Sequence, residues 1–413
     1  MYDRVQSVMW LTIIVVIVSI VVCRGVTDTT SNYYDLSTYC KKTGETIKCK
    51  DMIHIISWFN LHPLGFRNGT NLEVIGTDPR KRAYLNPESY RGMHNWKRIR
   101  ILDTNLDHLD PYSFEHMDNL ESAHFINTGL EYIMANIFYD LPKLREVILT
   151  RNRLIALKFS VSNKCPMFKL LDVGDNKINF TSDESFFFEI GSILHINLNN
   201  NRLYTSFKND MQHYPDRIRN LWYSHNKFTE LRADWFRLRK NLRIVNFAYN
   251  QIEYVENNTF KDNPNLHTII LSYNKLTTIP MSLLPANFYP NLKYLAIDHN
   301  WIMGLDTTKK GPLKLLTNLK KISLAGNPFY CSCFQEVQNQ INHLSLQEVC
   351  SEKETPEHTR DLCIIEAENY NTPCHLIPAS ENAENRENFL EENTALPVSF
   401  DSMYCALAEF INA

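Results

Sequence analysis

Apolar and polar positions recur along most of the chain with a stride of 24 to 27 residues. The unit is clearest at residues 242–252 (LRIVNFAYNQI) and 266–276 (LHTIILSYNKL), which both fit the eleven-position pattern L-x-x-L-x-L-x-x-N-x-L. The fourth and sixth positions stay apolar in most units, and a period of two indicates a short strand with one buried face. A fixed stride of this size predicts a solenoid, in which strands from successive turns stack in parallel into one long sheet.

The units are aligned on their first apolar position, which falls at Leu72, Trp96, Leu120, Leu144, Phe168, Ile193, Ile218, Leu242, Leu266, Leu292 and Leu319. The ninth position is asparagine in most units: Asn152, Asn176, Asn201, Asn226, Asn250, Asn274, Asn300 and Asn327. Thr104 and Thr128 hold it in two early units, and Arg80 holds it in the first. We interpret the asparagines as structural, because a buried amide needs hydrogen-bond partners, and the first unit as a degenerate end of the array.

A second apolar set follows the strands at spacings of three residues, as in Phe114 and Met117 or Phe138 and Leu141. This spacing is typical of a short helical or 3-10 turn. We therefore expect such turns on the convex side of the solenoid, opposite the strands.

These repeats resemble the extracellular leucine-rich-repeat family, and the match extends over residues 72–363. The resemblance implies an α/β solenoid: a curved horseshoe with a parallel concave sheet, short helical or 3-10 turns on the convex side and disulfide-capped ends. It also implies that the ninth-position asparagines bond the backbone of neighbouring turns as a ladder. The arrangement is similar to insect leucine-rich immune proteins and to Toll-like receptor ectodomains, although no heptad-rich coiled coil follows the cap.

The same patterns divide the chain into five regions. We predict a signal peptide at residues 1–25, an N-terminal segment with a cysteine cap at 26–71, about eleven repeats at 72–329, a cysteine-rich cap at 330–366 and an acidic, Asn-rich tail at 367–413. Arg4 precedes the apolar run of the signal, and small residues follow it at the usual cleavage positions. An uncleaved anchor is the alternative, but about 16 apolar residues are short for a membrane span. We expect a secreted, extracellular protein with no membrane span after signal removal.

Cysteine use agrees with an oxidising compartment. Cys40 and Cys49 flank Gly44, which can form the turn of a cap hairpin closed by a disulfide. Cys165 lies in a longer connector, and we interpret it as a buried free thiol; a bond to the C-terminal tail or to another chain is the alternative.

Four later cysteines, Cys331, Cys333, Cys350 and Cys363, look like the C-terminal cap of the resembled family. The resemblance implies the pairs Cys331–Cys350 and Cys333–Cys363, whereas spacing alone leaves three pairings open. A zinc site is the other interpretation of such a set, but at a solenoid end in a secreted chain we expect disulfides.

Little in the chain points to catalysis. There is no Gly-rich phosphate loop, no Gly-x-Ser-x-Gly elbow and no His-Glu-x-x-His zinc helix, so we predict no enzymatic activity, no cofactor and no metal. The net charge is −3 with both signs interspersed, which argues against a nucleic-acid partner. Three sequons, at Asn68, Asn179 and Asn257, are candidate glycosylation sites.

The concave face is therefore the candidate site. Equivalent positions of successive strands lie about 4.8 Å apart and form continuous rows. Aromatic and imidazole rings gather in these rows at Trp222, His225, Tyr249, Tyr273, Tyr294 and His299. Tyrosine and tryptophan anchor interfaces, since they bury a large area with few rotatable bonds. The alternative is that rings in a column only pack on one another.

We predict that this face binds a protein or a glycoconjugate, and the family resemblance implies innate immunity as the setting. An extracellular-matrix, adhesion or guidance role is the alternative. Protonation of His225 and His299 beside the tyrosines can make binding pH-sensitive. Cys374 and Cys405 in the tail pair with each other or with a disulfide-linked partner chain.

Overall fold

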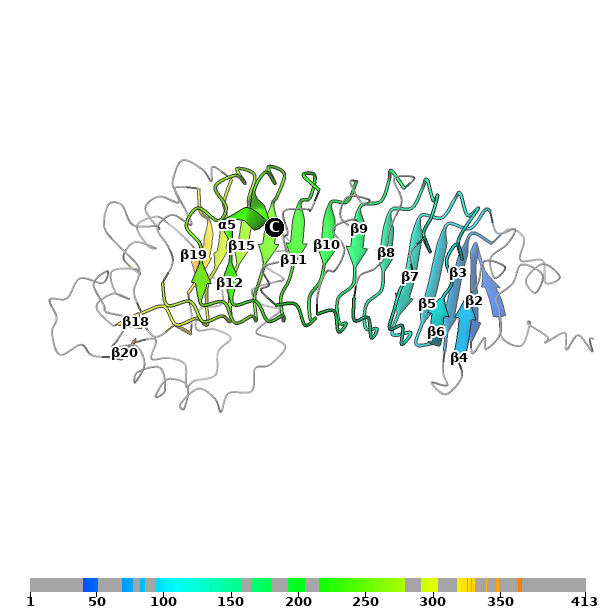
Figure 1. The fold of residues 1–413 in the computed structure, drawn as a ribbon, viewed down its shortest axis with the longest axis horizontal. Helices are drawn as coiled ribbons and strands as arrows, with labels where there is room; N and C mark the ends of the chain where they lie inside the picture. The colour runs from blue at the N-terminus through cyan, green and yellow to red at the C-terminus, as the bar shows by residue number, and fades with distance from the viewer. Residues whose placement is uncertain are drawn as a thin grey trace, which may run out of the picture.

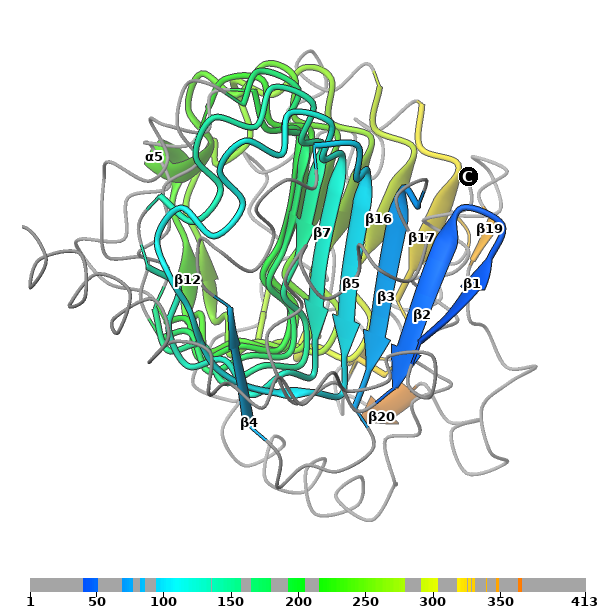
Figure 2. The same ribbon diagram turned by 90° about the vertical axis from the view of Figure 1, so that its right-hand side faces the viewer.

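The computed structural model describes residues 40–50, 69–76, 82–85, 94–134, 136–156, 165–179, 192–204, 215–278, 291–303, 318–324, 326–327, 329–330, 339, 347–348 and 363–365. Over these residues the chain winds into a solenoid, and each turn adds a strand to one long sheet (Figure 1). In the view along the row of strands, the sheet forms one side of each turn, and loops with short strands close the other (Figure 2). The predicted solenoid with a parallel sheet is confirmed.

The main sheet has 14 strands in the order β1-β2-β3-β5-β7-β8-β9-β10-β11-β13-β15-β16-β17-β19. Strands β1 and β2 pair antiparallel, and every later pair in the sheet is parallel. The strands are β1 (Cys40–Thr43), β2 (Thr46–Lys50), β3 (Asn71–Ile75), β5 (Arg98–Leu102), β7 (Ser122–Ile126), β8 (Glu146–Ile148), β9 (Leu170–Asp172), β10 (His195–Asn197), β11 (Asn220–Trp222), β13 (Ile244–Asn246), β15 (Thr268–Ile270), β16 (Tyr294–Ala296), β17 (Lys321–Ser323) and β19 (Gln347–Glu348).

Shorter elements lie outside this sheet. Three parallel pairs are β4 (Arg82–Leu85) with β6 (Asn105–Leu109), β12 (Glu230–Leu231) with β14 (Tyr254–Val255), and β18 (Phe329–Tyr330) with β20 (Cys363–Ile365). Helix α5 (Ala233–Phe236) is a single turn. In an earlier repeat, the N–H of Ser113 donates to the Asp110 carbonyl and that of Glu115 to the Tyr112 carbonyl, the i to i+3 pattern of a 3-10 turn. The expected short turns opposite the strands are therefore present.

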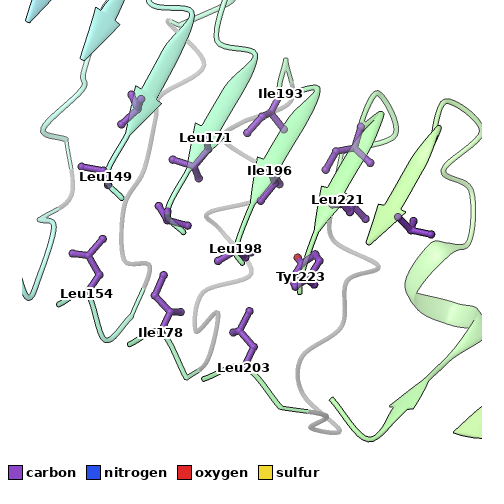
Figure 3. Packing of buried hydrophobic residues seen from close by; sticks show 14 of the residues in the cluster. Leu149, Leu154, Leu171, Ile178, Ile193, Ile196, Leu198, Leu203, Leu221 and Tyr223 are labelled. Carbon is purple, nitrogen blue, oxygen red and sulfur yellow. The ribbon is translucent and has the colours of Figure 1, made fainter. Parts of the chain in front are cut away.

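The core is a set of apolar columns that run through the solenoid. Fourth- and sixth-position side chains such as Leu171, Ile196 and Leu198 are at most 1% exposed and stack turn upon turn (Figure 3). A second column, with Ile178 and Leu203, packs against them from the eleventh position (Figure 3). Burying each of these side chains stabilises the fold by roughly 1.5–3 kcal/mol. Because every turn shares its columns with the next, the array is stable only as a stack.

The ninth-position asparagines form the predicted ladder. The Nδ2 group of Asn176 donates to the carbonyl of Leu149 in the preceding turn and to that of Val173 in its own turn, both at 3.0 Å. Its Oδ1 accepts the N–H of Leu154 at 3.0 Å. The same arrangement repeats along the array, and each of these asparagines is at most 9% exposed. Thr128 holds the ninth position of an early repeat, and its hydroxyl replaces the asparagine amide in part, since it donates to Asn152 Oδ1 at 2.8 Å.

The register of the first repeat differs from the prediction. Leu72 pairs with Ile99, a fourth-position residue, and Val74 pairs with Ile101, a sixth-position residue. Leu72 therefore occupies the fourth position and not the first, and Arg80 is not a ninth-position residue. The misalignment arose because first and fourth positions are both apolar; only backbone hydrogen bonds distinguish the two phases.

The N-terminal cap is the predicted hairpin. Cys40 and Cys49 face each other across β1 and β2 and form a disulfide. Gly44 lies in the turn with φ of +61°, the left-handed region that favours glycine. Strand β2 then pairs in parallel with β3, so the cap covers the open edge of the first turn.

Cys165 is the free, buried thiol that was predicted. Its Sγ donates to the Phe138 carbonyl at 3.4 Å, and burial raises the pKa of the thiol to about 11. Such a thiol remains protonated and unreactive at neutral pH.

Several predictions lie outside the described residues: the signal at 1–25, Asn68, Cys331, Cys333, Cys350, Cys374 and Cys405. Cys363 falls in β20, where it pairs with Phe329 of β18. The side chains of Asn179 and Asn257 are exposed. Across the described segments, no helix has the length and apolar character needed to cross a bilayer.

Candidate functional site

The eighth position of the repeat follows the strand, along the edge of the sheet where all the strands end. Its backbone conformation is unusual. It adopts a left-handed conformation, with φ between 51° and 65°, in ten successive turns: Asp103, Asn127, Arg151, Asp175, Asn200, His225, Tyr249, Tyr273, His299 and Gly326. Each turn is held there by the next one, as when the N–H of Tyr249 donates to the Ser272 carbonyl at 2.9 Å. Glycine, asparagine and aspartate tolerate this conformation, whereas bulky side chains are strained in it.

Four consecutive eighth positions nevertheless carry rings. His225, Tyr249, Tyr273 and His299 form what we call the ring stack. Its ring centroids lie 4.2, 4.1 and 4.0 Å apart in chain order, with interplanar angles of at most 10°. All four side chains are partly exposed. The stack is thus a continuous, half-exposed aromatic strip along one edge of the sheet.

Gly326 ends the stack on the C-terminal side. A Cβ atom at this position would lie 2.5 Å from Cδ2 of the His299 ring. The imidazole therefore lies directly on the Gly326 backbone, and any side chain there would displace it. The sequence signal for this end is the change from His299 to glycine at the eighth position of the next turn.

A polar network fixes the orientation of the last ring. His299 Nδ1 lies 3.0 Å from Oδ2 of the buried Asp298, and its Nε2 lies 3.3 Å from the Tyr273 hydroxyl. Burial raises the pKa of Asp298, but the hydrogen bond and charge of His299 and the hydroxyls of Ser272 and Ser323 outweigh it, so the carboxyl pKa lies below its usual value. Asp298 is therefore an ionised acceptor that holds the imidazole in the stack.

The other two predicted site residues, Trp222 and Tyr294, are not members of the ring stack. Trp222, at a fifth position on β11, is partly exposed and pairs with His195, with ring centroids 6.1 Å apart. Tyr294, at a third position on β16, is only 7% exposed and belongs to a buried cluster with Ala248 and Ile270, against which Tyr249 packs. Tyr294 thus presents little surface itself.

The N-terminal end of the concave face is a compensated charge cluster. Glu73 pairs with Arg100 at 2.8 Å and with Lys48 at 3.1 Å, so the basic character of Arg98 and Arg100 is partly neutralised. Beside it, Nε2 of His124 lies 2.8 Å from Ser122 Oγ and 3.0 Å from Glu146 Oε1.

These three residues do not form a nucleophilic triad. A catalytic histidine uses one ring nitrogen for the serine and the other for the carboxylate. Here both partners, Ser122 and Glu146, meet the same nitrogen of His124. Burial lowers the pKa of His124, against the hydrogen bond and charge of Glu146. Within the described segments, no group of histidine, cysteine or carboxylate side chains is arranged to hold a metal ion.

Sequence reasoning missed a second asparagine column. Asn119, Asn241, Asn265 and Asn291 each precede the first position of a repeat and donate to a backbone carbonyl of the preceding turn. The signal was present in the dipeptides Asn-Leu that open these repeats. The left-handed eighth position was also foreshadowed, since asparagine, aspartate and glycine occupy five of its ten places.

The burial of His225 in the ring stack predicts a stability that depends on pH. Burial lowers the pKa of His225, against a smaller opposing effect of Asp175. The unfolded chain then binds the proton more readily than the folded one, so stability present above about pH 6.5 is lost as the pH falls towards the lower folded pKa. We expect the melting temperature to fall between pH ~7.5 and ~5.5, and the variant His225→Asn to fall less. Calorimetry at both pH values checks this; equal decreases in both proteins would contradict it.

The fold and the repeats define the protein as a leucine-rich-repeat solenoid. Residues 216–276 match the family model described as leucine rich repeat, and residues 65–191 match that of the BspA type leucine rich repeat region, with six copies. The two matches fall on the parts of the chain where the parallel strands and the asparagine ladder are described.

Two solved structures show the same architecture. The chain is similar to one in the structure of the Toll–Spatzle complex, a molecular hub in Drosophila development and innate immunity, with a TM-score of 0.59 and 19% identity over 73% of this chain and 43% of that one. The glycosylated form of that complex gives 0.53 and 15% over 69% and 38%. The chain thus spans less than half the length of these proteins, and at such identities the likeness concerns the fold. No curated protein matches in sequence.

Proposed function

We propose that this is a non-enzymatic, extracellular recognition protein that binds a protein ligand through the ring stack, with Trp222 beside it. Leucine-rich-repeat solenoids support protein–protein recognition in general, because one regular face presents variable side chains in rows. One structure that the chain resembles was solved as a complex, Toll with Spatzle. A glycoconjugate is the second ligand class that an aromatic strip of this kind suits.

The observation that carries the proposal is a set of bulky rings kept in a strained backbone. A left-handed conformation costs a non-glycine residue about 1–2 kcal/mol. Tyr249 and Tyr273 have φ of 54° and 56°. Asparagine adopts this conformation at a lower cost, and Asn200 occupies the same position of the repeat two turns before Tyr249. Strain of this kind concentrates at ligand-binding sites, where the retained side chain has a use beyond folding. Tyrosine is also one of the residues enriched among interface hot spots, with tryptophan and arginine.

Secretion and a role in innate immunity are part of this proposal. The Cys40–Cys49 disulfide is typical of oxidising, extracellular compartments. The exposed sequon asparagines Asn179 and Asn257 fit the same setting. Expression that rises on infection, with the protein present in body fluid, would support immunity. Constant expression confined to one developing tissue would favour the adhesion or guidance alternative.

The test replaces the strained rings by the residue the backbone prefers. The double variant Tyr249→Asn/Tyr273→Asn relieves strain while it removes ring stacking worth about 0.5–1.5 kcal/mol per pair, so stability should change little. Binding should fall at least about tenfold, since interface tyrosines contribute about 2 kcal/mol when they act as hot spots. The measurement is quantitative capture from body fluid, analysed on non-reducing gels, with melting temperatures recorded in parallel.

A matched control removes two other tyrosines. Tyr132 and Tyr254 are 58% and 54% exposed and lie away from the stack, in the return segments of their turns. Tyr132→Asn/Tyr254→Asn should retain the proteins that the wild type captures. Undiminished capture by the Tyr249/Tyr273 variant would reject the ring stack as the binding surface and leave it a packing feature.

A further inference from the structure

The opposite edge of the sheet carries a second continuous row of side chains. It is formed by the second position of each repeat, immediately before the strand. The backbone links this row turn by turn, as when the N–H of Arg243 donates to the Arg219 carbonyl at 2.7 Å and that of His267 to the Arg243 carbonyl at 2.8 Å. Adjacent members are therefore held about 4.8 Å apart, the spacing of neighbouring strands.

Basic residues fill the C-terminal part of this row. We call it the basic ridge, and its members belong to five successive turns: Arg219, Arg243, His267, Lys293 and Lys320. The side chains of Arg219, Arg243 and Lys320 are exposed, and those of His267 and Lys293 are partly exposed. The row continues towards the N-terminus with Lys169 and Arg145 after a break at Leu194.

The charge of the ridge has no carboxylate partner among the residues that the structure describes. Over the described ranges, no ion pair to a carboxylate involves Arg219, Arg243, Lys293 or Lys320. The third positions beside them add no acid either, since they are Asn220, Ile244, Thr268, Tyr294 and Lys321.

The pKa of His267, a member of the row, is lowered by burial and by the positive charge of its neighbours. Burial lowers the pKa of its imidazole, and the charges of Lys293, Arg243 and Lys320 lower it further. Three cations thus act together on one point of the ridge, although the chain as a whole has a net charge of −3. Clustered charge of one sign on a protein of the opposite net charge is the pattern expected of a surface for a charged ligand.

We propose that the basic ridge binds a sulfated polysaccharide, laid along the edge of the sheet across successive turns. A linear polyanion matches the shape of the ridge, which is one residue wide and about 19 Å long for five turns. Arginine and lysine suit sulfate oxygens because the guanidinium donates in a fork and the ammonium acts as a compact charge. The choice of a sulfated glycan rests on the extracellular location proposed above.

Two other polyanions fit the ridge less well. Single-stranded nucleic acids need exposed aromatic faces on which bases stack, and Tyr294, the tyrosine next to the ridge, is only 7% exposed. A membrane surface needs apolar side chains beside the charges. The exposed large apolar residues of the described part, such as Tyr204, Leu238 and Tyr254, lie at other positions of the repeat.

The experiment measures binding of the full chain to heparin, a sulfated polysaccharide, at about 0.15 M salt. The ridge variant is Arg219→Gln/Arg243→Gln/Lys293→Gln/Lys320→Gln. The control variant removes four exposed cations from four successive turns at the tenth position, on the other edge: Arg153→Gln, Lys177→Gln, Arg202→Gln and Lys227→Gln. Both variants have the same net charge, so a difference between them reports the place of the charges. Circular dichroism confirms that both are folded.

We expect the ridge variant to lose about tenfold or more in affinity, because each exposed charge contact contributes modestly and four are removed. The control variant should stay within about twofold of wild type. Equal losses in both variants, or no loss in the ridge variant, would overturn the proposal. Tighter wild-type binding to single-stranded DNA or to phosphatidylserine vesicles, lost in the ridge variant, would reassign the ridge to that class. Heparin binding does not involve the tyrosines, so this test and the capture experiment fail independently.

Discussion

Replacement of Asn250 by alanine should lower the free energy of unfolding by about 3 kcal/mol. Its Nδ2 group donates to the carbonyls of Tyr223 and Phe247 at 3.0 Å, and its Oδ1 accepts the N–H of Phe228 at 3.1 Å. Alanine removes these partners from backbone groups that are buried between turns. Each unsatisfied buried group costs about 1–3 kcal/mol, and water has no access to replace the amide. Urea denaturation followed by circular dichroism measures the loss.

The appropriate control is an asparagine of the other column. Asn265 donates from an exposed side chain to the Lys240 carbonyl at 2.8 Å. Because water can take over that bond, Asn265→Ala should cost less than about 1 kcal/mol. If the two variants lost equal stability, the ladder would not be a special source of stability, and the apolar columns would account for the fold.

The second large effect is expected at Phe247, where alanine should cost about 4 kcal/mol. This sixth-position ring is fully buried. It packs between the strands and the segment that follows the strand of the preceding turn. It stacks on Tyr223 with centroids 5.2 Å apart and meets Phe228 and Phe236 edge-on at 5.5 and 6.0 Å. Alanine would leave a cavity among three rings that cannot collapse without moving the preceding turn. Chemical denaturation measures this change as well.

Replacement of Phe247 by leucine distinguishes the loss of filled volume from the loss of ring contacts. Phe247→Leu fills most of the volume and should cost about 1.5 kcal/mol. Tyr254→Ala, at a side chain that is 54% exposed, should stay within about 0.5 kcal/mol of wild type. A leucine variant as unstable as the alanine variant would show that ring contacts, and not filled volume, provide the stability.

Most of the fold could be predicted from the repeat pattern. Asparagines at the ninth position and apolar residues at the fourth and sixth predicted the stacked strands, because each turn uses the same few contacts as its neighbours. Gly44 between Cys40 and Cys49 predicted the cap hairpin for the same reason: turn, strands and disulfide are all local. Where alignment had no local constraint it failed, and Leu72 was placed three positions out of register.

For the candidate site, the pattern supplied the members of a row but not their geometry. The stride alone predicts one column of rings, formed by His225, Tyr249, Tyr273 and His299. Their left-handed backbone, their near-parallel rings and the glycine that ends the stack depend on hydrogen bonds between turns.

The solenoid, its ladder and its first cap could be predicted from the residues alone, because these residues recur at a fixed stride or satisfy one another locally. Which side chains of a row face outward depends on how the turns pack, and the repeat pattern does not contain this information. Tyr294 is buried in a cluster with Ala248 and Ile270, and Glu73 pairs with Lys48 and Arg100, because burial and charge pairing are set by neighbours from other turns of the solenoid.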